Sequence, residues 1–118
     1  MPALNFKKQF APLVESGVKR QSIRADRKDG RNPHAGETLY LYTGQRTKYC
    51  RKLREETCLS VENIAIEPGY RIAVGVRELS VREVNQMTKA DGFATFLEFF
   101  DFFRAVHGLP FYGKLIKW

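Results

Sequence analysis

Two clusters of basic side chains carry the clearest chemical signal in this 118-residue sequence, because clustered cations bind phosphate groups. Residues 19–31 hold six Lys and Arg against two acids, and residues 46–54 hold five with no acid. If the fold brings the two clusters together, they form a positive surface suited to nucleic acid or to a nucleotide. The alternative is a solvated basic surface that only aids solubility.

The start of the second cluster is typical of a phosphate-binding turn. A glycine, Gly44, is followed closely by a short polar run: Arg46, Thr47 and Lys48. Backbone amides and cations of one such turn can contact the same phosphate. Tyr42 precedes the turn, and its ring can stack on a base. The competing interpretation is an exposed basic loop after a tyrosine-bearing strand, and the sequence does not choose between the two.

The cysteines and histidines offer no cofactor site. Cys50 and Cys58 lie eight residues apart, which is not the spacing of a zinc site, and only two histidines are present. We therefore expect no metal and no other cofactor. The N-terminus has no signal-peptide pattern and no apolar stretch is long enough for a membrane span, so we expect a cytoplasmic protein without a membrane partner.

A chain of this length has room for one domain, residues 1–118. Periodicity and turn residues predict short elements before residue 79. We expect a helix over residues 11–16 and strands over residues 4–6, 19–24, 38–42, 58–67 and 70–76. Residues 25–36 are predicted as a basic loop and residues 44–56 as a polar segment with an irregular helical turn.

Two helices and a final strand are predicted after residue 79. Ser80 and Thr95 each stand three residues before a Glu, the capping-box pattern that begins a helix. The first helix is predicted to end at about Ala90 and the second to run over residues 96–107, before a last strand over 113–118. The apolar stripe of the second helix should face the core; it consists of Phe96, Phe99, Phe100, Phe103 and Val106. Strands on both sides of a helix pair suit an α+β fold, although periodicity does not choose between a barrel and an open sheet.

The segment that begins at Gly17 resembles the signature of ASCH domains, which are related to the RNA-binding PUA domains. The pattern Gly-x-Lys-x-x-x-x-Arg is matched by Gly17, Lys19 and Arg24, after a short helix and at the start of a strand. Residues 36–39, 42–48 and 91–93 extend the resemblance over most of the chain. It implies a PUA-like small mixed β-barrel, with a short N-terminal helix and a helix pair before the last strand.

The resemblance implies two kinds of activity. Some ASCH domains are RNA-binding modules, whereas small bacterial members remove the acetyl group from N4-acetylcytidine, and ribonuclease activity is attributed to some. The working groups of the hydrolase type are a Lys, a Thr three residues later and a Glu before the last helix. The matching positions here hold Lys19, Ser22 and Asp91.

The resemblance gives each of these groups a role in amide hydrolysis. Ser22 would be the nucleophile or would hold the attacking water, and Lys19 would be the base. Asp91 would pass the proton to the leaving amine, and Arg24 would hold the oxyanion or the substrate's carbonyl. Ser22 and Arg24 share one face of a strand, whereas Lys19 can join them only from a turn before regular pleating begins, which Gly17 permits. The alternative is that Lys19 and Arg24 contact phosphates and Ser22 is merely polar.

Three functional hypotheses follow. The first is a domain that binds RNA, another single-stranded nucleic acid or a modified nucleoside through a groove between the two basic clusters. The second is an amidohydrolase that uses Lys19, Ser22 and Asp91. The third is a phage-type regulatory protein that acts on a host protein, through the aromatic second helix. The oligomeric state stays open between a monomer and a weak homodimer.

Overall fold

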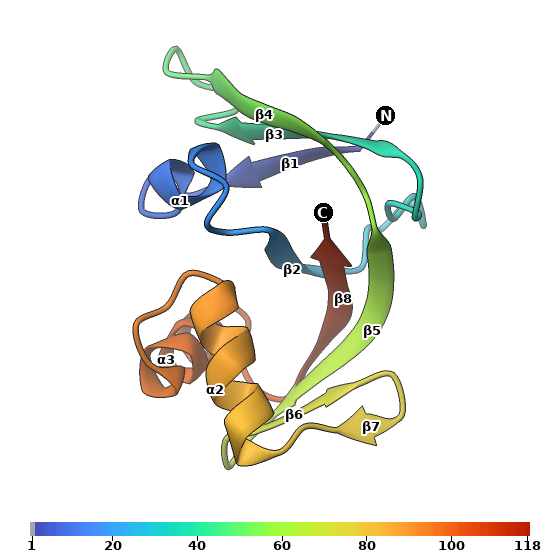
Figure 1. Cartoon of the computed structure of the whole chain (residues 1–118), viewed down its shortest axis with the longest axis vertical. Coiled ribbons are helices and arrows are strands. Elements are labelled where there is room, and N and C mark those ends of the chain that lie inside the picture. Colours follow the sequence, from blue (N-terminus) through green and yellow to red (C-terminus); the bar gives the residue numbers. More distant parts are fainter. Residues whose placement is uncertain (1) are drawn as a thin grey trace.

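The computed structural model describes residues 2–118, which form a mixed α+β fold (Figure 1). In chain order the elements are β1 (Ala3–Phe6), α1 (Ala11–Glu15), β2 (Gln21–Ala25), β3 (Thr38–Thr43), β4 (Arg51–Thr57), β5 (Ser60–Glu67), β6 (Arg71–Val74), β7 (Arg77–Glu78), α2 (Val81–Ala90), α3 (Phe96–Val106) and β8 (Phe111–Lys117). The predicted α+β class is therefore confirmed. Within residues 2–118, no helix has the length and apolar character required to cross a membrane.

The strands form two sheets, with the orders β1-β3-β4 and β2-β8-β5-β6-β7. Only the β1–β3 pair is parallel among the described strands. The closed barrel that we expected is not found among residues 2–118. The chain instead passes from one sheet to the other along a curved arm, in which β4 leads into β5 through Cys58 and Leu59 (Figure 1).

The prediction of an irregular helical turn within residues 44–56 is wrong. This region forms a turn followed by β4, which pairs antiparallel with β3. Only Leu53 is buried among the seven residues of β4, so the strand lacks the apolar alternation that would have identified it. Cross-strand pairing with β3 places its charged side chains on the surface.

Both predicted helix starts are confirmed. Ser80 begins α2 with a complete capping box, and the Thr95 side chain accepts a hydrogen bond from the Glu98 amide at the start of α3. The aromatic face of α3 packs into the core through Phe99, Phe100 and Phe103, whose side chains are buried.

One member of the predicted core stripe lies elsewhere. Val106, the last residue of α3, is 48% exposed, whereas Phe102 is partly buried against the core. Most of the aromatic surface of α3 is thus used inside the fold. Binding of a host protein through this helix stays a prediction, with Leu97 and Val106 as its exposed apolar side chains.

Candidate functional site

The two sheets and the helix pair meet at a pocket of about 260 Å³. Residues after β1, on β2 and on α3 all line it, as does the connection between α2 and α3. Its buried lining contains Lys19, Ser22 and Asp91, the three residues that the family resemblance implies, and Arg24 lines its side. Residues 72 positions apart along the chain therefore form one site.

Lys19 reaches this pocket because it precedes the regular pleat of β2. Gly17 adopts φ +82° after α1, a conformation that glycine takes without strain. The Lys19 amide then donates to the Leu13 carbonyl at 2.9 Å, which ties the turn to the helix. The side chain is 3% exposed and points into the fold. Lys19 therefore lies in a turn before β2, which is the only position from which the alternation of side chains along the strand allowed it to join Ser22.

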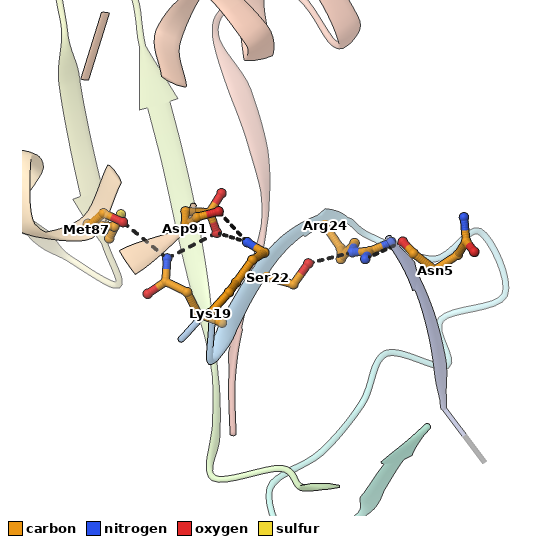
Figure 2. Close-up of polar contacts among 7 residues, drawn as sticks. Asn5, Lys19, Ser22, Arg24, Met87 and Asp91 are labelled. Atoms are coloured by element: carbon orange, nitrogen blue, oxygen red, sulfur yellow. Dashed lines mark hydrogen bonds and ion pairs between the residues drawn. The ribbon is translucent and has the colours of Figure 1, made fainter. Parts of the chain in front are cut away.

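Lys19 and Asp91 form a buried ion pair (Figure 2). Lys19 Nζ donates to Asp91 Oδ1 at 3.0 Å and to the Asp91 carbonyl at 2.5 Å. Burial lowers the pKa of Lys19, and the Asp91 charge opposes that shift. Burial likewise raises the pKa of Asp91, against the opposing effect of Lys19. Each charge thus opposes the neutralisation that burial favours in the other group.

Gln21 is a third member of this cluster, and sequence reasoning missed it. Gln21 Nε2 donates to Asp91 Oδ1 at 3.2 Å and approaches the Met87 carbonyl at 3.5 Å. Asp91 Oδ1 therefore accepts both side-chain bonds, and within residues 2–118 no hydrogen bond or ion pair is made to Oδ2. An unpaired carboxylate oxygen of a residue that is only 4% exposed remains for a donor in the pocket.

Ser22 and Arg24 share one face of β2, as predicted. Arg24 Nε donates to Ser22 Oγ at 2.7 Å, and a terminal nitrogen of Arg24 donates to the Asn5 carbonyl at 2.7 Å (Figure 2). The guanidinium carbon lies 4.8 Å from the centre of the Phe6 ring. Burial lowers the pKa of Arg24 to about 10, so the side chain stays a cation at neutral pH.

Aromatic rings form the apolar wall of the pocket. Phe10 packs edge to face on Phe93 at 5.3 Å and on Phe102 at 6.0 Å, and Lys19 Nζ lies 5.2 Å from the Phe10 ring centre. The sequence does not reveal this wall, because its members come from three separate segments whose packing only the tertiary fold determines.

The turn that bears Arg46, Thr47 and Lys48 lies outside the pocket. These residues are exposed between β3 and β4, whereas Tyr42 is partly buried on β3. Thr47 Oγ1 donates to the Gly44 carbonyl at 2.6 Å, so this hydroxyl stabilises the turn. The same hydroxyl oxygen accepts a hydrogen bond from the Tyr49 backbone amide at 3.1 Å.

The base of this turn is joined to the pocket through one residue. Asn5 accepts a bond from the Gln45 amide on its side-chain oxygen at 3.0 Å, and one from Arg24 on its carbonyl. The turn therefore lies next to the pocket rim without lining the pocket.

The two basic clusters meet away from the pocket, at an acid. Arg20 and Arg54 both contact the carboxylate of Glu56, at 3.3 Å and 2.7 Å. Two more cations of the second cluster are paired with acids, as Arg51 with Glu15 and Lys52 with Glu55. Much of the second cluster's charge is thus neutralised locally, and no acid pairs with Arg46 or Lys48 in residues 2–118. In the same range, no group of three His, Cys, Asp or Glu gathers to hold a metal ion.

Comparisons of the chain with protein-family models, curated proteins and solved structures give no match.

Proposed function

We propose that this chain is an ASCH-type domain of the PUA-like class that binds a nucleobase, of RNA or of a modified nucleoside, in the Lys19–Asp91 pocket. The observation that carries the proposal is the convergence of Lys19, Ser22, Arg24 and Asp91 on one aromatic-walled pocket. Family resemblance singled out these positions from sequence alone, and a chance set would not be expected to share a pocket.

The chemistry of the pocket suits a base. Aromatic rings take the flat face of a base, and polar groups contact its edge. Asp91 Oδ2 accepts from an amino group, while Lys19 and the Ser22 hydroxyl donate to a ring nitrogen or a carbonyl. The pattern of one free acceptor beside two donors favours cytosine and its N4-modified forms over uracil, which carries no amino group.

Calorimetric titration with cytidine, N4-acetylcytidine and uridine tests this proposal. Phe102→Ala should weaken cytidine binding about tenfold, because it removes part of the stacking wall. Phe96→Ala is the matched control, since Phe96 is also a partly buried ring on α3 but packs on Tyr70, away from the pocket. Equal affinities of the two variants, or a preference for uridine, would contradict the proposal.

The exposed turn offers a second contact for an RNA strand. Arg46 and Lys48 have no acidic partner in residues 2–118 and lie beside the pocket rim through Asn5. Replacing both with alanine should lower RNA affinity and reduce the slope of log affinity against log salt by about 0.7 for each lost phosphate contact. An unchanged slope would place the RNA elsewhere.

The buried Lys19–Asp91 pair beside Ser22 favours amide hydrolysis as a second candidate function. In this mechanism Ser22 holds a water that adds to the acyl carbon of an N4-acylated cytidine, while Lys19, in the neutral form that burial favours, accepts the proton of this water. Arg24 stabilises the oxyanion, the bond from carbon to N4 breaks, and Asp91 passes the proton from Lys19 to N4. The products are cytidine and a carboxylic acid.

Release of cytidine from N4-acetylcytidine, followed by chromatography, tests this candidate. Ser22→Ala and Lys19→Ala should each reduce the rate more than about a hundredfold. Ser16→Ala removes an exposed hydroxyl at the end of α1 and should turn over at the wild-type rate. Absence of turnover in the wild type, or equal rates in all four proteins, would exclude hydrolysis and leave the binding proposal in place.

A further inference from the structure

The mouth of the Lys19–Asp91 pocket has its own chemistry, distinct from that of its buried lining. Lys7, which follows β1, and His107, which ends α3, line the pocket from two different elements, and both side chains are exposed. Lys7 Nζ lies 5.5 Å from the centre of the Phe102 ring, so the ammonium group is drawn toward the aromatic wall.

His107 is held in place by aromatic contacts. Its ring stacks on Phe103 with centroids 5.5 Å apart and an interplanar angle of 29°. A second ring, that of Phe111 on β8, has its centroid 4.7 Å from the centroid of the His107 ring. Packed rings on two sides restrict the imidazole, and its nitrogens are the polar atoms that it can present at the mouth.

The charge of the pocket is unbalanced in favour of cations. Asp91 is the sole acid that lines it within residues 2–118, and this carboxylate is already paired with Lys19. Lys7 and Arg24 therefore leave surplus positive charge, which favours an anionic ligand. A volume of about 260 Å³ lies near the lower end of small-ligand sites, so a base with part of its sugar fills it and an attached anion stays at the mouth.

We propose that the pocket takes a nucleoside phosphate rather than an uncharged nucleoside, with the phosphate at the mouth between Lys7 and His107. This inference rests on the proposed function, because it places the base on the buried lining near Asp91. The phosphate belongs either to a free nucleotide or to an RNA strand, and both present the same oxygens to the two side chains.

Binding of the phosphate should be coupled to a proton on His107. Partial burial and the Lys7 charge lower the pKa of His107, so the imidazole is neutral at pH 7 without ligand. An anion at the mouth reverses the effect of Lys7, raises that pKa and favours the charged ring. The other charged groups on the surrounding elements are Glu98, Asp101 and Arg104 on α3, Lys114 and Lys117 on β8, and Arg24 on β2; Asp101 and Arg104 are paired with each other.

Proton resonances of the two imidazoles, followed against pH, test the proposal directly. Cytidine 5′-monophosphate should raise the pKa of His107, whereas the resonances of His34, which lies in the loop after β2, should not respond to the ligand. Cytidine should bind without moving the pKa of His107. The monophosphate should bind about tenfold tighter than cytidine, the gain expected of one charge-assisted contact, and the ratio should grow as the pH falls from 8 to 7, a range above the second pKa of the phosphate at about 6.

Variants separate the phosphate contact from the base contact. Lys7→Gln should bring the affinity ratio of monophosphate to cytidine close to one. Lys8→Gln is the matched control, because Lys8 is the exposed neighbour that does not line the pocket. His107→Asn should keep a preference for the monophosphate that no longer depends on pH.

The outcomes distinguish this inference from the proposed function. Equal affinities for monophosphate and cytidine, with a His107 pKa that neither the monophosphate nor a cytidine-containing trinucleotide moves, would overturn the phosphate site and leave the base pocket intact. Failure of every nucleoside and nucleotide to bind would overturn both. A cytidine-containing trinucleotide that raises the His107 pKa when the monophosphate does not would support the site and assign its phosphate to an RNA strand.

Discussion

Replacing Lys19 with methionine should lower the free energy of unfolding by about 3–5 kcal/mol at neutral pH, because the Asp91 carboxylate is left buried without its cation. The side chains of Lys19 and Asp91 are 4% and 6% exposed, and the change removes two hydrogen bonds, of 3.0 Å and 2.5 Å. The bond from Gln21 remains but cannot replace a full charge. Since a domain of this size is stable by only about 5–15 kcal/mol, the variant should retain a small margin.

The loss of stability in Lys19→Met should depend on pH, and the pKa of Asp91 determines the direction of this dependence. Burial raises the pKa of Asp91 in the folded protein, and without Lys19 nothing of equal strength opposes that effect. A carboxyl group with a raised folded pKa stabilises fully below its unfolded pKa of about 3.9, and this stability is lost as the pH rises toward the folded pKa. The difference between wild type and Lys19→Met should therefore shrink in acid, by up to about 1.4 kcal/mol per pH unit.

Urea unfolding followed by circular dichroism at pH 7 and pH 4.5 measures both effects, provided that the slopes against urea agree. Lys52→Met is the matched control, because Lys52 is exposed and paired with Glu55 at the surface, where solvent screens the pair; its free energy of unfolding should stay close to that of the wild type. A Lys19→Met loss below about 1 kcal/mol at pH 7, or one that does not shrink in acid, would refute the reasoning. Adding Asp91→Leu to a variant that is too unstable to measure should restore part of its stability.

Three further predictions concern other parts of the fold. Gly113→Ala should lower the free energy of unfolding by about 1–3 kcal/mol or more and shift the Arg24 resonances. The reason is that the added Cβ would lie 2.3 Å from the Arg24 carbonyl oxygen. An unchanged melting temperature would contradict this close approach. Ser80→Ala should cost about 1 kcal/mol by removing the cap of α2, measured by thermal unfolding. Cys58 should resist iodoacetamide in the native state, because it is 1% exposed and burial raises the pKa of its thiol, while the exposed Cys50 reacts; mass spectrometry distinguishes the two.

Short sequence patterns correctly predicted the elements that depend on neighbouring residues, such as helix starts and strands with alternating apolar residues. Both helix starts after residue 79 follow from capping boxes, and the alternating apolar residues of 38–42 mark a strand that spans Thr38–Thr43. Strand β4 was missed because cross-strand pairing, rather than an apolar face, holds it. The division into two sheets could not be predicted from the sequence either, because it depends on how β4 continues into β5 rather than on any periodicity.

The polar residues of the candidate site could be predicted from the sequence, whereas the aromatic residues that line the pocket could not. The motif located Lys19 and Arg24, and the resemblance to hydrolase-type ASCH domains located Ser22 and Asp91; all four line one pocket. The expected groove between the two basic clusters relied on charge alone, whereas the fold places Glu56 where the clusters meet. Net charge along the chain cannot reveal such pairing, because the neutralising acids come from other segments.

The antiparallel pairing of β2 with β8 has a consequence for the order in which the molecule is made. Gln21 pairs with Lys117 and Ala25 with Gly113, so the strand that bears Ser22 and Arg24 has its hydrogen-bonding partner at the far end of the chain. Contacts of such sequence separation form slowly, because they close a long loop. A growing chain that has not yet released residues 111–117 from the ribosome carries every polar group of the pocket and still has no pocket. Synthesis therefore separates the appearance of Ser22 and Arg24 from that of their partner strand by 88 to 96 residues, the separations of Ala25 from Gly113 and of Gln21 from Lys117.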